Sequence, residues 1–423
     1  MASDDQDGQS ASSKTGEEVD LTLEVAILII LGVFMLLFGL LLFKIHRGDL
    51  PYAPDSTYGL FLVIVSLQII TMGKTPFLDL RRSWMVVIIG IVTAILGMYA
   101  CFIPGSLTTP ARMLVGIMLL VGGAAHLIQL ITSEEMAKKW MKTSRILQHL
   151  TAACGLVYLM SAILGIVTLL PGITTDPQTA VLLIIYGIGF FYLSWCIQKV
   201  NRLYSLRDPR STTKDQRSQE HRRPRGGFGF FRDATLPLSH AITILVGVLL
   251  TLLGLLLVPV NLGLIPFSPD GQLGLLLVII AVQMLAIGET PIGQYRRSLL
   301  LIIIGIVFAA AGIVSCIVPG ILTGVIQIMV GLLNIIGGAL LITKRFIPIL
   351  HEMRNPPAEP VALDPIIKRL LITQTAINIV GICFGITMLV PSLVSGPVIA
   401  GVLVANGLLL FVLTYYLQKM RDM

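Results

Sequence analysis

The sequence predicts an all-α integral membrane protein with about twelve transmembrane helices, arranged as two parallel six-helix repeats. Hydrophobic residues make up 55% of the 423 residues and charged residues 13%, and the mean hydropathy is +0.89. A soluble domain of this size needs more charge to cover its surface. Apolar runs such as 21–43 and 299–318 are long enough to span a bilayer. The third observation is that one stretch of the chain occurs twice.

The duplicated stretch reads QIITMGKTPFLDLRRS at 68–83 and QMLAIGETPIGQYRRS at 283–298, at an offset of 215 residues. Between 59–108 and 274–323, 24 of 50 positions are identical. Chance similarity between apolar segments would not also align glycine, proline and arginine. The aligned motif residues are Gly73, Thr75, Pro76, Arg81 and Arg82 in the first copy and Gly288, Thr290, Pro291, Arg296 and Arg297 in the second. The chain is therefore an internal duplication.

Four regions follow in order along the chain. Residues 1–20 are acidic and rich in serine, and we expect a disordered cytoplasmic tail. The run at 21–43 follows an acidic start and is too long for a cleaved signal, so it is interpreted as a retained helix. Residues 21–199 form the first six-helix repeat, 200–236 a basic cytoplasmic linker, and 237–423 the second repeat.

Twelve apolar segments account for the predicted helices. They lie near 22–43, 57–73, 84–103, 110–131, 148–170, 178–198, 239–260, 272–288, 299–318, 322–343, 367–390 and 396–417. With a cytoplasmic N-terminus, 27 of the 30 Lys and Arg residues fall inside, and three fall outside: Lys44, Arg47 and Arg112. The positive-inside rule therefore predicts a multi-pass protein of the cytoplasmic (inner) membrane with both termini cytoplasmic.

The linker at 200–236 supplies much of the net charge of +7. Basic clusters beside a membrane commonly meet anionic lipid headgroups or fix the topology, and we expect these roles here, with the lipid bilayer as the main partner. Nucleic-acid binding is not expected, because no binding module or interleaved aromatic residue accompanies the charge.

Glycines recur at steps of seven residues and end at an outer proline. Gly90, Gly97 and Pro104 are matched by Gly305, Gly312 and Pro319. A step of seven returns to nearly the same helix face, so each glycine pair presents a smooth groove to a neighbouring helix. Proline followed by glycine then stops the helix. The pattern predicts a helical hairpin closed by an outer Pro-Gly turn, used three times in each half.

At these residues the chain resembles the HdeD-like short-repeat membrane proteins, whose pattern is an arginine before a helix, glycines at seven-residue steps and an outer Pro-Gly turn. The best match is at Arg82, Gly90, Gly97, Pro104 and Gly105, with Gly116, Gly122 and Gly123 on the return helix, and it recurs at the equivalent positions of the second half. The resemblance covers about half of the chain clearly. It implies a fused pair of HdeD-like units with a link to stress or acid resistance, and it brings no catalytic or binding residues.

A second resemblance is to the major facilitator transporters, which also have six plus six helices and a long loop between the halves. Gly73 followed by Arg81 and Arg82 fits the spacing of their signature between helices two and three. The acidic residue that this signature requires four positions after the glycine is absent, because Phe77 and Ile292 stand there. The alternative function is thus a secondary transporter that moves a small solute through a mid-membrane site at the repeat interface.

Candidate polar positions are few. Lys74 and Glu289 are equivalent in the two copies, and opposite charges there either meet and gate the inner face or snorkel separately to water. Gln68 and Gln283 lie deeper and either hydrogen-bond across helices or line a polar path.

Catalytic and cofactor signatures are absent from the sequence. It contains no nucleophile–base pairing, phosphate loop, zinc spacing or dinucleotide fingerprint, so no enzyme activity, cofactor or metal is expected. Cys101 and Cys316 are equivalent, and either pack as small hydrophobes or pair as a disulfide.

Overall fold

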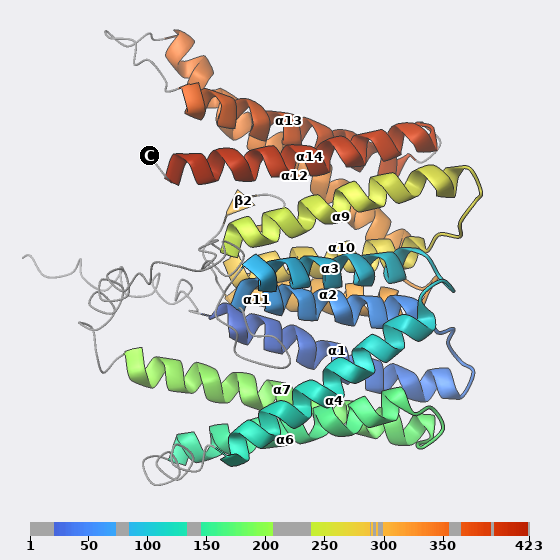
Figure 1. Ribbon diagram of the computed structural model, residues 1–423. Helices are drawn as coiled ribbons and strands as arrows, with labels where there is room; N and C mark the ends of the chain where they lie inside the picture. The colour runs from blue at the N-terminus through green and yellow to red at the C-terminus, as the bar shows by residue number, and fades with distance from the viewer. Residues whose placement is uncertain are drawn as a thin grey trace, which may run out of the picture.

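The computed structural model describes residues 21–72, 84–132, 145–205, 238–287, 289–290, 293–294, 299–354, 365–390 and 393–421. These residues form twelve α-helices and one pair of two-residue strands (Figure 1). In the first half of the chain the helices are α1 (Leu23–His46), α2 (Pro54–Met72), α3 (Trp84–Phe102), α4 (Thr108–Thr132), α6 (Arg145–Leu169) and α7 (Asp176–Ser205). In the second half they are α9 (Leu238–Asn261), α10 (Pro269–Ile287), α11 (Leu299–Ile317), α12 (Thr323–Arg354), α13 (Pro365–Leu389) and α14 (Gly396–Arg421).

The prediction of an α-helical membrane protein is confirmed at this level. Nine of the described helices are long and apolar enough to cross a membrane, and α2, α3 and α10 carry shorter apolar stretches. Large aliphatic side chains face outward along these helices, such as Ile303 and Val307, which are 50% and 57% exposed. An apolar surface of this extent fits a lipid environment and not water.

Three local features differ from the predicted elements. Helix α7 continues to Ser205, into the predicted linker, and α12 continues to Arg354, well past the apolar segment. Polar residues extend a helix readily once its apolar part is anchored by packing. Strands β1 (Glu289–Thr290) and β2 (Gly293–Gln294) pair antiparallel in the connection between α10 and α11, where no strand was predicted.

The same three helix pairs occur in each half. In the first half α1 packs on α7, α2 on α3, and α4 on α6; in the second, α9 packs on α14, α10 on α11, and α12 on α13. Glycines bring the paired backbones together. A Cβ atom added at Gly97 would lie 2.6 Å from the carbonyl oxygen of Gly59, and one added at Gly312 would lie 2.5 Å from that of Gly274. The grooves expected from the glycine spacing are therefore occupied by backbone.

The predicted hairpin with an outer Pro-Gly turn is wrong for α3 and α4. These two helices make few contacts although the turn at Pro104 and Gly105 joins them. Helix α4 instead runs obliquely away from α2 and α3 to reach α6 (Figure 1). The glycine grooves of α3 and α4 face different partners, so the short turn connects two separate pairs. Helices α6 and α7 do pack on each other.

Helices α2, α3, α10 and α11 form the centre of the molecule, with α1 and α9 beside them (Figure 1). Helices α4, α6 and α7 lie at one end of the row, and α12, α13 and α14 at the other. Two backbone hydrogen bonds join the halves at the centre. The Ala53 N–H donates to the Ile317 carbonyl at 3.0 Å, and the Ser268 N–H donates to the Phe102 carbonyl at 2.8 Å. Both donors and both acceptors differ by the repeat offset of 215 residues.

Candidate functional site

The duplicated motif lies mostly outside the described residues. Gly73, Lys74, Thr75, Pro76, Arg81 and Arg82 fall there, as do Gly288, Pro291, Arg296 and Arg297. Glu289 and Thr290 form β1, which pairs with Gly293 and Gln294, but their side chains are not described. A gate between Lys74 and Glu289 therefore stays a prediction.

Gln68 and Gln283 lie half-buried near the ends of α2 and α10, at the centre of the molecule. Their neighbours along both helices are aliphatic and closed off from solvent: Leu60, Leu62, Leu275 and Leu277 each have 0% exposure. Leucines thus close off much of the central helices, although Ser66 of α2 is also fully buried there, and the polar path that the two glutamines could line stays a prediction.

Two equivalent aspartates organise the end of the central helices at which α2 and α10 begin. Asp55 stands in the first turn of α2, and one of its carboxylate oxygens accepts from the Gly105 N–H at 2.9 Å. Asp270 stands in the first turn of α10 and accepts from the Gly320 N–H at 3.0 Å and from the Thr323 hydroxyl. Gly105 and Gly320 have φ values of +82° and +86°, which favour glycine. Each aspartate therefore holds the turn that follows its partner helix.

Cys101 and Cys316 meet at the boundary between the halves. Both have 0% exposure, both are free thiols, and the two side chains interact directly. Each thiol also contacts a backbone carbonyl, Cys101 that of Ser56 at 3.5 Å and Cys316 that of Gly271 at 3.7 Å. Of the two predicted possibilities, the structure has packed thiols.

A cavity of about 210 Å³ lies inside the first half, between α1, α2, α4, α6 and α7. Its wall is mainly aromatic and aliphatic, with Phe34, Phe38 and Phe61 among the lining residues. Arg112 of α4 and Tyr58 of α2 bring polar groups to the same wall. The residues that follow α6, including Thr174, and the first residues of α7 also line it, which places it near the end of the bundle at which α7 begins.

The Nε of Arg112 is buried and makes no hydrogen bond within the described chain. Lining hydroxyls, by contrast, are engaged: Thr57 donates to the Ala53 carbonyl at 2.8 Å, and Thr168 to the Leu164 carbonyl at 2.7 Å. At the rim, His46 Nδ1 and Asp176 Oδ2 lie 2.9 Å apart. The cavity therefore combines a guanidinium whose buried Nε lacks a partner among the described residues with a mainly apolar wall.

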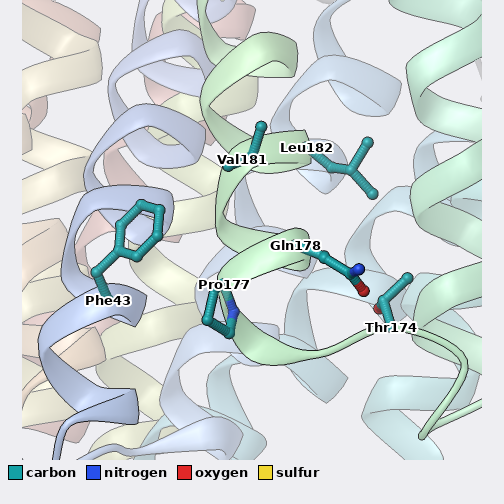
Figure 2. Close-up of a pocket in the computed structure, with 6 residues that line it drawn as sticks. All are labelled: Phe43, Thr174, Pro177, Gln178, Val181 and Leu182. Atoms are coloured by element: carbon teal, nitrogen blue, oxygen red, sulfur yellow. The ribbon is translucent and has the colours of Figure 1, made fainter.

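A second, shallow depression lies on the other side of α7 (Figure 2). Phe43 of α1 lies across from Pro177 and Val181, while Gln178 extends toward Thr174. Gln178 already accepts from the Thr175 N–H at 3.0 Å. The depression offers an apolar surface without a charged group.

Sequence reasoning missed the roles of Asp55, Asp270 and Arg112. A signal for the aspartates was available, because each follows a proline at the start of its helix and the two differ by the repeat offset. Arg112 was counted only as one of three outer charges. Its equivalent in the second half is Gln327, and this difference between the copies could have marked it.

Comparison of the chain with protein-family models, with curated proteins and with solved structures gives no match. Among the described residues, no group of three or more His, Cys, Asp or Glu side chains could hold a metal ion.

Proposed function

We propose that the chain is an HdeD-like membrane protein of the cell (inner) membrane, built from two parallel six-helix repeats, with both termini cytoplasmic and a role in stress or acid resistance. On this proposal it acts as a structural component of the membrane and not as an enzyme. The basic linker at 200–236 would then lie against anionic lipid headgroups of the inner leaflet.

The observation that supports this proposal is the closed packing between the halves. A Cβ atom added at Gly271 of α10 would collide with the Cys101 carbonyl oxygen of α3, so the two halves meet backbone to backbone there. The Ala53–Ile317 and Ser268–Phe102 backbone hydrogen bonds join the halves on either side of this contact. A carrier with its site at the repeat interface needs polar groups and room for a solute there. The described part of this interface is closely packed, and its buried polar side chains Ser56, Cys101 and Cys316 are engaged by backbone carbonyls, which supports a structural role over the transporter alternative.

Acid survival of cells that lack the gene tests the proposed role. We expect survival after acid challenge to fall and to recover when the full-length chain is expressed from a plasmid. Unchanged survival would remove the acid-resistance part of the proposal. Uptake of a broad panel of solutes into proteoliposomes tests the alternative directly, and saturable uptake of any one of them would replace the structural role with transport.

The proposed orientation is tested with a single introduced cysteine. Leu264, between α9 and α10, is 71% exposed and should lie outside. In a variant without the native cysteines, Leu264→Cys should react with a membrane-impermeant maleimide on intact spheroplasts. Labelling that requires membrane disruption would reverse the assigned orientation.

A further inference from the structure

The first-half cavity has an unusual charge balance for a site within a membrane helix bundle. Arg112 is half-buried, and its Nε has no hydrogen-bond partner in the described chain. Neither the His46–Asp176 nor the Arg47–Asp49 ion pair at this end of the molecule includes it. A cation that is partly withdrawn from water and lacks an anion is costly. An anionic ligand would supply the missing partner.

A second arginine within a helix shows how this fold satisfies such a group when no ligand is needed. In α12, Arg345 donates to the Leu371 carbonyl at 3.1 Å and to the Thr375 hydroxyl at 3.2 Å, and it also donates to Gln374. All three partners lie on the adjacent helix α13. Among the residues that the structure describes, Arg112 has no comparable set of acceptors, and its Nε makes no hydrogen bond.

The second half of the chain serves as an internal control, because several of its equivalent positions carry other residues. Gln327 stands at the position of Arg112, and its amide donates to the Met388 carbonyl at 2.7 Å. Leu273, Met388 and Ile399 replace Tyr58, Thr168 and Thr179. Packing of the repeat therefore does not require an arginine and hydroxyl groups at these positions, and the first half retains them for another reason.

The size and wall of the cavity limit the ligand. A volume of about 210 Å³ exceeds the ~150 Å³ apolar cavity that takes up benzene, and it falls short of the roughly 300 Å³ at which pockets for drug-sized molecules begin. Phe34, Phe38 and Phe61 line it with aromatic rings. Such a wall suits a short hydrocarbon group and excludes a free inorganic anion, which would lose its water without compensation.

We propose that this cavity binds an anion with a small apolar group, held by Arg112 at its charged end and by the aromatic wall at its hydrocarbon end. A monocarboxylate of medium chain length has this chemistry, and so does the anionic headgroup region of a lipid with the start of its acyl chain. The proposal goes beyond the structural role given above and does not depend on it.

The groups around the cavity are compatible with an anion. The carboxylate of Asp176 at the rim is engaged by His46 at 2.9 Å. Tyr52, which precedes α2, stacks on Phe38 with a centroid distance of 6.0 Å, and burial raises the pKa of its phenol further above its ordinary value, so it adds no negative charge. Tyr58 contributes a hydroxyl to the same wall as Arg112. Arg112 is therefore the basic side chain in the described lining of the cavity, and the acidic lining residue Asp176 is held at the rim by His46.

Calorimetric titration of the full-length protein in phosphatidylcholine nanodiscs with octanoate tests the proposal. We expect saturable binding of octanoate and none of octanol, which lacks the charge, or of acetate, which lacks the hydrocarbon. Arg112→Gln introduces the residue that the second half carries, and it should weaken octanoate binding roughly 10- to 100-fold because a charge-assisted contact is lost. Arg47→Gln is the matched control at the same end, and should bind as the wild type does.

A second variant tests the apolar part of the cavity. Leu164→Phe places in α6 the residue found at the equivalent position of α13, where Phe384 is 3% exposed. The larger ring should fill the cavity and abolish octanoate binding while the protein retains its unfolding temperature. Because both test variants copy residues from the other repeat, loss of binding with an unchanged unfolding temperature separates a ligand site from a folding defect.

Repeating the titration in phosphatidylglycerol nanodiscs distinguishes the two sources of the anion. If phosphatidylglycerol competes with octanoate, and this competition is lost in Arg112→Gln, the site binds a lipid headgroup. If the affinity for octanoate is the same in phosphatidylglycerol and phosphatidylcholine nanodiscs, the site binds a soluble acid. The proposal is overturned if octanoate and phosphatidylglycerol both fail to bind, or if Arg112→Gln binds as tightly as the wild type.

Discussion

At the scale of single residues, the two aspartates in the first turns of α2 and α10 make the most specific prediction. Asp55→Ala should lower the free energy of unfolding by about 1–3 kcal/mol, because the Gly105 N–H loses the acceptor oxygen of a buried carboxylate, now 2.9 Å away. Asp270→Ala should cost at least as much, since Asp270 also accepts from Thr323. Thermal or denaturant unfolding of the purified protein in detergent, followed by tryptophan fluorescence, measures this.

Asp49→Ala is the control for these variants. Asp49 lies at the same end of the molecule, but its side chain is 54% exposed and its contact with Arg47 is 3.9 Å long. Exposed ion pairs contribute little, so we expect its stability to stay within about 0.5 kcal/mol of the wild type. An Asp55→Ala variant as stable as Asp49→Ala would show that the turn at Gly105 is held by other contacts.

Residue roles were the least predictable feature of this sequence. Composition and spacing place Arg112 near a membrane boundary, but they do not determine whether its side chain reaches water or turns between helices. That choice depends on the oblique path of α4, which brings Arg112 beside Tyr58 and the phenylalanines of α1 and α2. The outer charges Lys44 and Arg47, by contrast, are exposed as their positions suggest.

At the scale of helices, glycine substitutions should separate tight pairs from open faces. Gly97→Ala would place a Cβ atom 2.6 Å from the Gly59 carbonyl oxygen, and a backbone atom cannot move aside as a side chain does. Helices α2 and α3 would have to part, at a cost of about 1–3 kcal/mol. Gly312→Ala should behave alike in the second half, where the distance is 2.5 Å. Unfolding in detergent measures both.

Gly401→Ala in α14 is the matched control. No atom lies within 4 Å of a Cβ added there, so the substitution should be neutral or stabilise the helix by up to about 1 kcal/mol. Equal effects of Gly97→Ala and Gly401→Ala would mean that close helix contact contributes nothing measurable at Gly97.

The seven-residue glycine spacing predicted that these helix faces are contact faces, because a face lined by glycine lets any neighbouring helix approach closely. It did not predict the partners. The Pro-Gly turn was assigned to a hairpin of α3 and α4, yet α3 packs on α2 and α4 on α6. Several helices in a membrane bundle offer equally smooth faces, and the choice among them depends on how all of them fit together.

At the scale of the whole molecule, the packing of the two halves places Cys101 and Cys316 against each other, and this contact provides a test of the arrangement. A variant that keeps only these two cysteines, with Cys154, Cys196 and Cys383 replaced by Ala, would carry a protease site in the linker at 200–236. After cleavage in the membrane and mild oxidation with copper phenanthroline, the two halves should migrate as one disulfide-linked band, and reduction should separate them.

Cys316→Ser in the same background removes one thiol and should leave two bands under both conditions. The direct interaction of the buried side chains is the reason for this expectation, and it follows from the central position of α3 and α11. Two separate fragments after oxidation of the two-cysteine variant would contradict the packing of α2 and α3 against α10 and α11.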